Sequence, residues 1–499
     1  MALIYTVAYR GLTPILVNVE CSICDSAIPR FILVGLPDKS VSEAKERVLS
    51  VLQGLNLQLP PKKIIINLSP ANIKKEGNHY DLPIALALLS TLQILPSLKD
   101  ILAIGELSLN GNLLKVNGSL IAATCASNNN LDIICPYENG PEAIWGCGEA
   151  QVFAPHNLQS LINHFKGLQV LNVVKPKLLE SNKNTGRIFD SILGQTAAKR
   201  ACVVSCAGGH SLFMIGPPGA GKTSICNAAV ELLPDLNITE ALDVAKIYSA
   251  AGLQNQEISL RPPFQAPHYT ISIMGLLGGG TGMLPGIASL AHNGLLFLDE
   301  LGEFNKSTLD TLRTVIEKKI INISRASYHT QIPADFLFFA AANPCNCLLG
   351  KSNKCSKCIR NILSNAIIDR IDLFIYLNKP QNTTLGYTFN HSKQCVEKVR
   401  KIQKLRFANE DWKLNADINS SKLEEYIICN NEITNLLANA AEKYQLSFRK
   451  KDKILKIAKT ITDLSMLNLE IQEIANNKTI TKAALLEAID YIRISSFFL

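Results

Sequence analysis

Residues 212–223 read LFMIGPPGAGKT, and this stretch decides how the middle of the chain folds. The four apolar residues LFMI predict a short buried strand, and the SICNAAVELL that follows predicts a helix. Glycines between them let backbone N–H groups close around phosphate, with a lysine reaching the β- and γ-phosphates. The flanking strand and helix argue against a chance match. We therefore predict a nucleotide-binding loop formed by Gly216, Pro217, Pro218, Gly219, Ala220, Gly221, Lys222, Thr223 and Ser224.

A second predicted strand ends in two carboxylates. The apolar run Leu295–Leu298 is followed directly by Asp299 and Glu300. Adjacent carboxylates repel each other, which is costly unless a cation or a reacting water uses them. We predict that Thr223 and Asp299 bind Mg²⁺ and that Glu300 orients the attacking water.

A third predicted strand, Phe336–Ala342, ends in Asn343, where a parallel sheet opens toward its ligand. Asn343 is thus a candidate for holding the water near the γ-phosphate. Arg370 lies between Asp369 and Asp372, which leaves two interpretations. It is either a structural arginine paired locally, or an arginine finger supplied to the nucleotide of a neighbouring subunit, which requires a ring.

The length of 499 residues exceeds what one hydrophobic core supports, so several domains are expected. Residues 1–170 predict a mixed α/β domain, residues 171–188 a polar linker, residues 189–380 a parallel-sheet core, and residues 381–499 a helical domain. The clearest runs in the first domain are the strand-like Ile15–Val19, Phe31–Val34 and Lys63–Asn67 and the helix-like Ser40–Leu52 and Leu82–Leu92; in the last domain they are the helix-like Lys451–Leu464 and Lys482–Arg493.

The bulk composition limits the class of protein. Apolar residues make up 47% of the chain, which is a globular composition, and the formal charge of +8 permits a polyanionic partner without requiring one. No secretory signal is recognisable at the N-terminus, and the apolar runs are far shorter than the roughly 20 residues of a membrane helix. We expect a cytoplasmic protein with no membrane partner.

Four cysteines follow the third strand as a CxC and a CxxC with seven residues between them. Such a density of thiolates suits tetrahedral Zn²⁺, although the CxC pair is tighter than the usual CxxC. The alternative is a set of reduced surface thiols, which oxidise readily. The candidate zinc ligands are Cys345, Cys347, Cys355 and Cys358.

With these motifs in place, the chain resembles the ComM/YifB family of Mg-chelatase-like AAA+ ATPases along nearly its whole length. The resemblance is carried by a series of motifs in order: GLPDKSVSEAKERV (35–48), INLSPANIKKEG (66–77), YDLPIAL (80–86), AGGHSLFMIGPPGAGKT (207–223), RPPFQAPHYT (261–270), SLAHNGLLFLDELGEF (289–304), AAANPCNC (340–347) and IIDRIDL (367–373).

The resemblance implies a hexameric ring motor that assembles with ATP, whose ComM members are associated with DNA branch migration during natural transformation. It implies an α/β AAA+ core with a C-terminal helical lid. The implied roles are Walker A for Lys222 and Thr223, Walker B for Asp299 and Glu300, and sensor 1 for Asn343. Arg370 matches the family's LLDRID arginine, and Arg449 in LSFRKKDKIL matches its sensor 2 arginine.

The first domain of this family is similar to the S5 fold of Lon-type proteases. A Lon-like site pairs a serine with a downstream lysine, but the matching segment KEGNHYD places His79 near the serine position, and Asn117 falls near the lysine position. Without the hydroxyl nucleophile and its amine base, acyl-enzyme chemistry cannot start. We predict no peptidase activity.

Three segments are candidates for contact with nucleic acid or for movement. Residues 319–338 read as a hairpin carrying Arg325, Tyr328 and His329, which is either pore-facing in a ring or simply solvated. The basic run from Arg449 to Lys459 is a second candidate, though charge runs are usually solvated helix faces. The glycine-rich Met274–Gly286 reads as a mobile loop.

These observations leave three hypotheses. The first is a ring ATPase that moves or remodels single-stranded or branched DNA. The second is a chelatase-type ATPase that remodels a protein partner during metal insertion. The third, a Lon-like protease, is disfavoured by His79 and Asn117.

Overall fold

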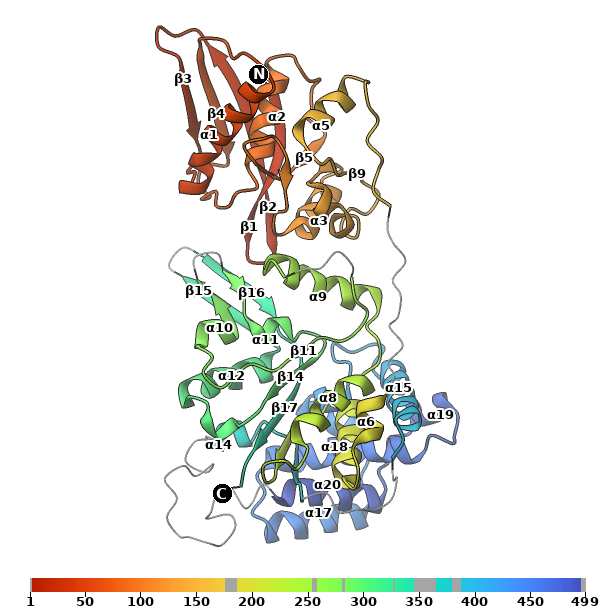
Figure 1. The fold of residues 1–499 in the computed structure, drawn as a ribbon. Coiled ribbons are helices and arrows are strands. Elements are labelled where there is room, and N and C mark those ends of the chain that lie inside the picture. The colour runs from red at the N-terminus through yellow and green to blue at the C-terminus, as the bar shows by residue number, and fades with distance from the viewer. Residues whose placement is uncertain are drawn as a thin grey trace.

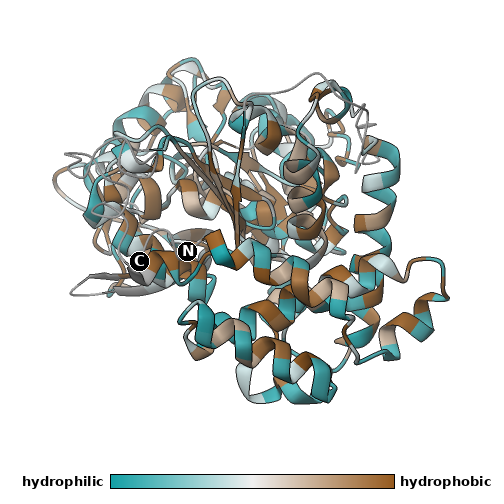
Figure 2. Ribbon diagram, turned by 90° about the horizontal axis from the view of Figure 1, so that it is seen from below, coloured by the Kyte–Doolittle hydropathy of each residue, from teal (hydrophilic) through white to brown (hydrophobic). Residues whose placement is uncertain are grey.

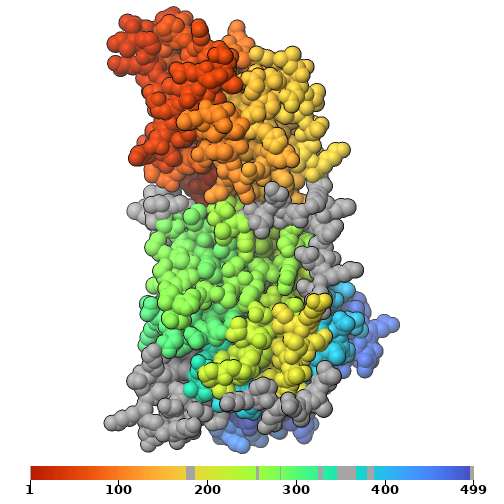
Figure 3. Space-filling view, in the orientation of Figure 1, coloured from red at the N-terminus to blue at the C-terminus, as the bar shows by residue number. Residues whose placement is uncertain are grey.

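The computed structural model describes residues 2–175, 186–253, 258–280, 283–325, 328–344, 365–378 and 387–494, with the backbone alone for residues 324, 325, 328, 329, 365 and 366. The molecule is elongated: the N-terminal part stacks on a central part, and the C-terminal helices pack at the far end (Figure 1, Figure 3). In the part of the chain that is described, no helix is both long and apolar enough to cross a membrane.

The N-terminal part is built on a mixed sheet of seven strands in the order β3-β4-β2-β1-β5-β8-β9. The strands are β1 (Ala2–Arg10), β2 (Thr13–Cys24), β3 (Arg30–Val34), β4 (Lys63–Ser69), β5 (Ile101–Ala103), β8 (Asp132–Ile134) and β9 (Val152–Phe153), and the short β6 (Glu106–Leu107) and β7 (Leu113–Leu114) pair separately. Helices α1 (Lys39–Gly54) and α2 (Asp81–Thr91) bury their apolar side chains in one core cluster, and α3 (Ser119–Asn128) and α4 (Gly140–Ala143) in another. The predicted strands and helices of this part are confirmed in their type and place.

The central part contains a sheet of five parallel strands in the order β11-β14-β17-β10-β18, here called the central sheet. Its strands are β10 (Leu212–Ile215), β11 (Phe264–Gln265), β14 (Leu295–Leu298), β17 (Leu337–Ala342) and β18 (Leu373–Tyr376). Along the chain β10 comes first, but in the sheet it lies between β17 and β18, so the carboxyl ends of all three meet at one edge. This confirms the predicted parallel α/β core.

Both faces of the central sheet are covered, because successive side chains of a strand point to opposite faces. Leu212 and Met214 join a core cluster with α7 (Thr196–Gly208) and α8 (Lys222–Leu232), whereas Phe213 and Ile215 join a cluster with α12 (Lys306–Lys318). The remaining helices of the central part are α6 (Arg187–Ser191), α9 (Ile238–Ala250), α10 (Ile273–Leu277), α11 (Ile287–Leu290) and α14 (Asn365–Ile368).

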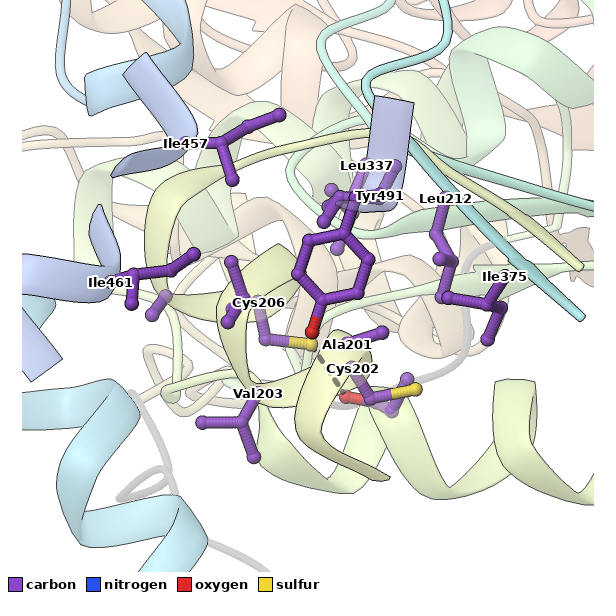
Figure 4. Close-up of a cluster of buried hydrophobic side chains, with 14 of the residues drawn as sticks. Ala201, Cys202, Val203, Cys206, Leu212, Leu337, Ile375, Ile457, Ile461 and Tyr491 are labelled. Atoms are coloured by element: carbon purple, nitrogen blue, oxygen red, sulfur yellow. Dashed lines mark hydrogen bonds between the residues drawn. The ribbon is translucent and has the colours of Figure 1, made fainter. Parts of the chain in front are cut away.

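The described residues after position 387 are mainly helical: α15 (Phe389–Arg406), α16 (Leu423–Tyr426), α17 (Asn431–Lys443), α18 (Phe448–Ser465), α19 (Ile471–Asn476) and α20 (Lys482–Arg493). Apolar and polar residues alternate along these helices, as Figure 2 shows. Their apolar faces share one cluster with the central sheet: Tyr491 lies beside Cys206 of α7, and Ile457, Ile461 and Ile375 of β18 belong to the same cluster (Figure 4). The two predicted C-terminal helices are confirmed.

The N-terminal part rests on two elements of the central part. Leu120 of α3 packs against Ala241 and Ala245 of α9, and the Gly118 N–H donates to Ser249 O over 3.2 Å. The second element is the hairpin of β15 (Ile320–Arg325) and β16 (Tyr328–Pro333), which confirms the hairpin prediction for residues 319–338. Its Thr330 hydroxyl donates to Arg10 O at 3.3 Å, beside the turn between β1 and β2.

The glycine-rich segment is more ordered than the predicted loop. Its described residues form α10 and two short strands, β12 (Gly278–Gly279) and β13 (Leu284–Pro285), which pair with each other. Gly278 and Gly286 approach so closely that a Cβ on Gly286 would lie 2.2 Å from Gly278 N. Glycine here therefore serves close backbone packing.

Candidate active site

The loop between β10 and α8 has the backbone that a phosphate cradle needs. Gly219 and Gly221 have φ angles of +76° and +87°, a region that favours glycine. Gly216 is required for a different reason, since a Cβ there would lie 2.8 Å from Leu377 Cβ. Gly221 is the N-cap of α8, so the first N–H groups of this helix point toward the loop and can bind anionic oxygens.

Lys222 lies at the centre of the site. Its Nζ donates to Gly216 O at 2.7 Å, to Pro217 O at 3.1 Å and to Asn343 Oδ1 at 2.8 Å. Burial lowers the pKa of Lys222, and the carboxylates of Asp299 and Glu300 oppose that shift. The structure thus brings the predicted lysine and the predicted strand-end asparagine together.

The predicted Mg²⁺ ligands are also adjacent. The Thr223 hydroxyl donates to Asp299 Oδ2 at 2.7 Å, and Asp299 Oδ1 accepts from the Glu300 N–H at 2.8 Å. A hydroxyl and a carboxylate are the hard oxygen ligands that Mg²⁺ takes, so these residues fit the ion. Ser224 is exposed in the first turn of α8, next to Thr223.

Glu300 has an unusual backbone. Its φ is +50°, in the left-handed region that a non-glycine residue rarely adopts, and its side chain is exposed. Strained conformations of this kind cost about 1–3 kcal/mol and cluster at functional sites. The conformation occurs directly after β14, where the Glu300 N–H donates to Asp299 Oδ1.

Gln195 is a residue of this site that the sequence did not suggest. It is buried just before α7, and its Nε2 donates to Ala220 O at 3.3 Å and to Asn378 O at 2.7 Å. One amide thus ties the phosphate loop to the end of β18. Its partners are backbone carbonyls, which carry no sequence signal.

Arg370 and Arg449 lie away from the loop, at the opposite edge of the central sheet. Arg370 precedes β18, whose first residue Leu373 pairs with Leu212 at the start of β10, whereas the loop follows the end of β10. Lys453, one turn after Arg449, pairs with Asp372 at 2.8 Å. The carboxyl edge of the central sheet thus carries the phosphate loop, and the amino edge carries these arginines.

Arg370 has a partner outside its own segment. Its Nη2 donates to both carboxylate oxygens of Glu317 on α12, at 2.9 Å each. The carboxylate of Asp372 instead accepts from Ser211 N and from Lys453. The structural interpretation of Arg370 as paired within its own IIDRIDL segment is therefore incomplete, because a helix 53 residues earlier supplies a carboxylate partner.

The basic run on α18 is only partly an exposed face, since Arg449 is exposed but Lys450 and Lys459 are buried. Lys459 is fully buried and pairs with Asp463 at 2.5 Å, and Lys453 is committed to Asp372. Lys456 donates to Ala416 O at 3.2 Å. The interpretation of this run as a nucleic-acid surface is therefore wrong for the buried Lys459, and for the exposed Arg449 it stays a prediction.

Other predicted residues lie elsewhere or outside the described part. His79 is buried and donates from Nε2 to Val7 O at 2.8 Å, and burial lowers its pKa to about 4, whereas Asn117 is exposed beside Gly252. The four candidate zinc ligands, Cys345, Cys347, Cys355 and Cys358, lie outside the described residues, as do the side chains of Arg325, Tyr328 and His329. Within the described ranges, no three His, Cys, Asp or Glu residues form a metal-binding group.

Comparisons with known proteins cover almost the whole chain. Family models described as Subunit ChlI of Mg-chelatase, as Magnesium chelatase, subunit ChlI, and as Magnesium chelatase, subunit ChlI C-terminal match residues 19–139, 188–385 and 388–492, respectively. Competence protein ComM of Haemophilus influenzae is 37% identical over 486 residues, covering 93% of this chain and 94% of that protein. YifB of Escherichia coli is 35% identical over 505 residues, covering 98% and 97%. A shorter match, 23% identical over 242 residues, is to DNA replication licensing factor MCM4 of Drosophila melanogaster and covers 47% of this chain and 25% of that protein.

These matches agree with the geometry of the site. The matched segment 188–385 contains the phosphate loop, the carboxylate pair, Asn343 and Arg370, and the segment 388–492 contains Arg449. Membership of such a family indicates an ATPase that uses ATP and Mg²⁺, which fits the adjacent Lys222, Thr223 and Asp299. The chain therefore belongs to the ComM/YifB family of Mg-chelatase-like AAA+ proteins.

Proposed function

We propose that this protein is an ATP-driven ring motor that binds single-stranded or branched DNA and drives branch migration or similar remodelling. The observation that carries the proposal is the division of the catalytic groups between two edges of one sheet. Lys222, Thr223 and Asp299 converge at the carboxyl edge, and Arg370 and Arg449 belong to the amino edge. This division fits a nucleotide site in which one copy supplies the phosphate loop and the next copy supplies the arginines. Such a contact repeats from copy to copy and can close into a ring.

At the carboxyl edge each residue has a defined task. Lys222 offsets charge on the β- and γ-phosphates, and Thr223 and Asp299 hold the metal. Mg²⁺ held by these residues would supply positive charge to offset the charge that develops on the phosphates. Glu300 is the residue for orienting the attacking water, since its exposed side chain follows the metal-binding Asp299 directly at the end of β14. Asn343 fixes the lysine through its Oδ1 and leaves its amide to hold the water.

Arg370 is proposed to act on the nucleotide of a neighbouring copy, with Arg449 as a second cation. Mixing separately inactive Arg370→Ala and Lys222→Ala subunits tests this. Mixed rings then contain some interfaces with an intact loop on one side and an intact arginine on the other, so part of the ATPase activity returns. No recovery in mixtures that still assemble would count against a shared site.

The DNA part of the proposal has independent support. The family resemblance implies DNA branch migration, the name of one relative refers to competence, and that of a distant one to DNA replication licensing. The net charge of +8 is compatible with a polyanion. The experiment is the ATPase rate with single-stranded, duplex and branched DNA, beside Lys222→Ala. We expect DNA to stimulate the ATPase rate, and the stimulation to fall as the salt concentration rises. If DNA neither stimulates the rate nor binds in a salt-dependent way, this part of the proposal is wrong.

A second candidate is a chelatase-type ATPase that remodels a protein partner during metal insertion. The observation in its favour is that all three matching family models are described by magnesium chelatase subunit ChlI. The same assay separates the two, because a chelatase-type ATPase is expected to be indifferent to DNA.

The four cysteines at positions 345, 347, 355 and 358 keep their place in the proposal as a structural zinc site. Elemental analysis of carefully reduced protein should find about one zinc per chain, and a Cys355→Ser/Cys358→Ser variant should lose it. Protein without zinc would remove this part and leave the ATPase proposal unchanged.

A further inference from the structure

Glu317 pairs with Arg370, the arginine that is proposed to act on the nucleotide of a neighbouring copy. It lies on the last turn of α12, and both of its carboxylate oxygens accept from Arg370 Nη2 at 2.9 Å. The Arg370 side chain is only 8% exposed, whereas that of Glu317 is 49% exposed. A group approaching from solvent therefore meets the carboxylate more readily than the guanidinium.

The surroundings of Glu317 carry an excess of positive charge. The hydrogen bond from Arg370 holds the pKa of Glu317 below its ordinary value, and the charges of Arg449 and Arg313 add to the effect. Arg313 lies four residues earlier on the same helix, and both Arg313 and Arg449 are exposed. Three guanidinium groups act on this one carboxylate, so the cluster can also attract a second, more highly charged anion.

The same edge also presents an apolar contact. Phe448, next to Arg449 in the first turn of α18, is 85% exposed, and Lys451 lies over its ring at 5.1 Å from the centroid. An exposed aromatic residue beside a cationic cluster is typical of a protein interface. The anion that such an interface would bring to the arginines is the terminal phosphate of a nucleotide held by the Lys222 loop of another copy.

We propose that Glu317 is a positioning residue that keeps Arg370 paired in the separate chain and yields it to the γ-phosphate of the nucleotide bound by an adjacent copy. The inference rests on the proposed sharing of sites between copies. Glu317 acts as a resident counter-ion: it stabilises the buried guanidinium before assembly and has to be displaced during assembly. Removing its charge therefore favours the assembled state over the separate chain.

Glu317→Gln tests this directly, because the amide keeps the size of the side chain and removes the charge. The protein concentration and the ATP concentration at half-maximal ATPase rate should both fall about two- to fivefold, with kcat little changed. The matched control is Glu432→Gln, which removes the same charge from a surface pair with Lys482 and should shift neither. A fall in kcat with no shift in either midpoint would overturn the proposal.

A double-mutant cycle shows whether Glu317 works through Arg370. Residual ATPase and nucleotide-dependent assembly of Arg370→Ala should be the same with and without Glu317→Gln, since the guanidinium that the carboxylate holds is gone. A shift of the same size in the Arg370→Ala background would overturn the proposal. Glu317→Asp retains the charge but shortens the reach, so it provides a second variant, expected to shift the midpoints in the same direction, if the glutamine variant folds poorly.

Failure of this inference can be told apart from failure of the shared site. If mixed Arg370→Ala and Lys222→Ala subunits recover activity but Glu317→Gln behaves as the wild type, only the role of Glu317 is wrong. If the mixtures recover nothing while they assemble, the shared site itself is wrong and the role of Glu317 falls with it.

Discussion

The carboxyl and amino edges of the central sheet hold their charged groups in contrasting ways. At the carboxyl edge, Lys222, Asn343 and Asp299 follow strand ends and contact loop carbonyls and one another. At the amino edge, Asp372 is tied to Lys453 of α18, and His210 to Thr460 of the same helix. One edge is arranged for a ligand and the other is joined to the C-terminal helices. Substitutions at the first should alter activity, and substitutions of Asp372 or His210 at the second should alter stability.

The largest effect is expected at the carboxyl edge. Lys222→Ala removes the ammonium that lies within 3.1 Å of two loop carbonyls and Asn343, and with it the charge that offsets the phosphates. The ATPase rate should fall by about 100-fold or more, measured as phosphate release, with little change in the thermal unfolding midpoint. Lys482→Ala, which breaks a surface pair, is the control. A variant that keeps half of the activity would show that the loop is not the catalytic site.

The reverse pattern is expected for Asp372. Its carboxylate accepts from Ser211 N and Oγ at 2.9 Å and pairs with Lys453. Asp372→Ala leaves that lysine without its partner in a largely buried site and should lower the free energy of unfolding by about 3 kcal/mol, measured by urea denaturation. The exposed pair of Asp490 and Arg493 serves as the comparison, and Asp490→Ala should cost about 0.5 kcal/mol or less. Equal losses in the two variants would contradict the difference between buried and surface pairs.

Acid should weaken the amino edge. Burial lowers the pKa of His210 to about 4, so the folded state keeps the ring neutral while the unfolded chain titrates near its ordinary value. The contribution of the neutral ring is present above about pH 6.5 and is lost as the pH falls toward 4. Between pH 7 and pH 5 the loss should be about 2 kcal/mol, and His210→Gln should remove that part of the pH dependence.

Burial also lowers the pKa of His79, in the N-terminal part, to about 4. His79 should therefore cause a similar loss of the free energy of unfolding between pH 7 and pH 5, and this loss should remain in His210→Gln. Urea denaturation at the two pH values is the measurement. Substitution of the exposed His156 by Gln is the control and should leave the pH dependence unchanged. An unchanged pH dependence in His210→Gln would contradict the role of His210.

The smallest effect on activity is expected from Gln195, which links the phosphate loop to the end of β18 by hydrogen bonds. Gln195→Ala removes two hydrogen bonds, to Ala220 O and Asn378 O. Loosening the loop should raise the KM for ATP about fivefold, as expected for about 1 kcal/mol of lost support, with kcat less affected. The exposed Gln159, which bonds Asn163, is the control. An unchanged KM would show that the loop holds its shape without this tie.

The sequence predicted the carboxyl edge better than the amino edge for a physical reason. Lys222, Asp299 and Asn343 each follow a short apolar strand, and parallel strands bring such ends together. At the amino edge the partners come from distant segments, as with Arg370 and Glu317 or Lys453 and Asp372, and no local pattern pairs them. The basic run on α18 was misread because its buried members look like exposed ones until the partner of each lysine is known.

The core that the C-terminal helices share with the central sheet has a consequence for how the protein folds during its synthesis. His210 bonds Thr460, a residue 250 positions later, and Tyr491 lies in the same cluster as Leu212. At roughly 5 to 20 residues per second, the ribosome needs on the order of 10 to 50 s to deliver those helices after β10 has been made. During that interval α7 and α8 are present on this face, but the part of the core that the C-terminal helices complete stays open. The core on that face is therefore complete only after the last hundred or so residues have emerged.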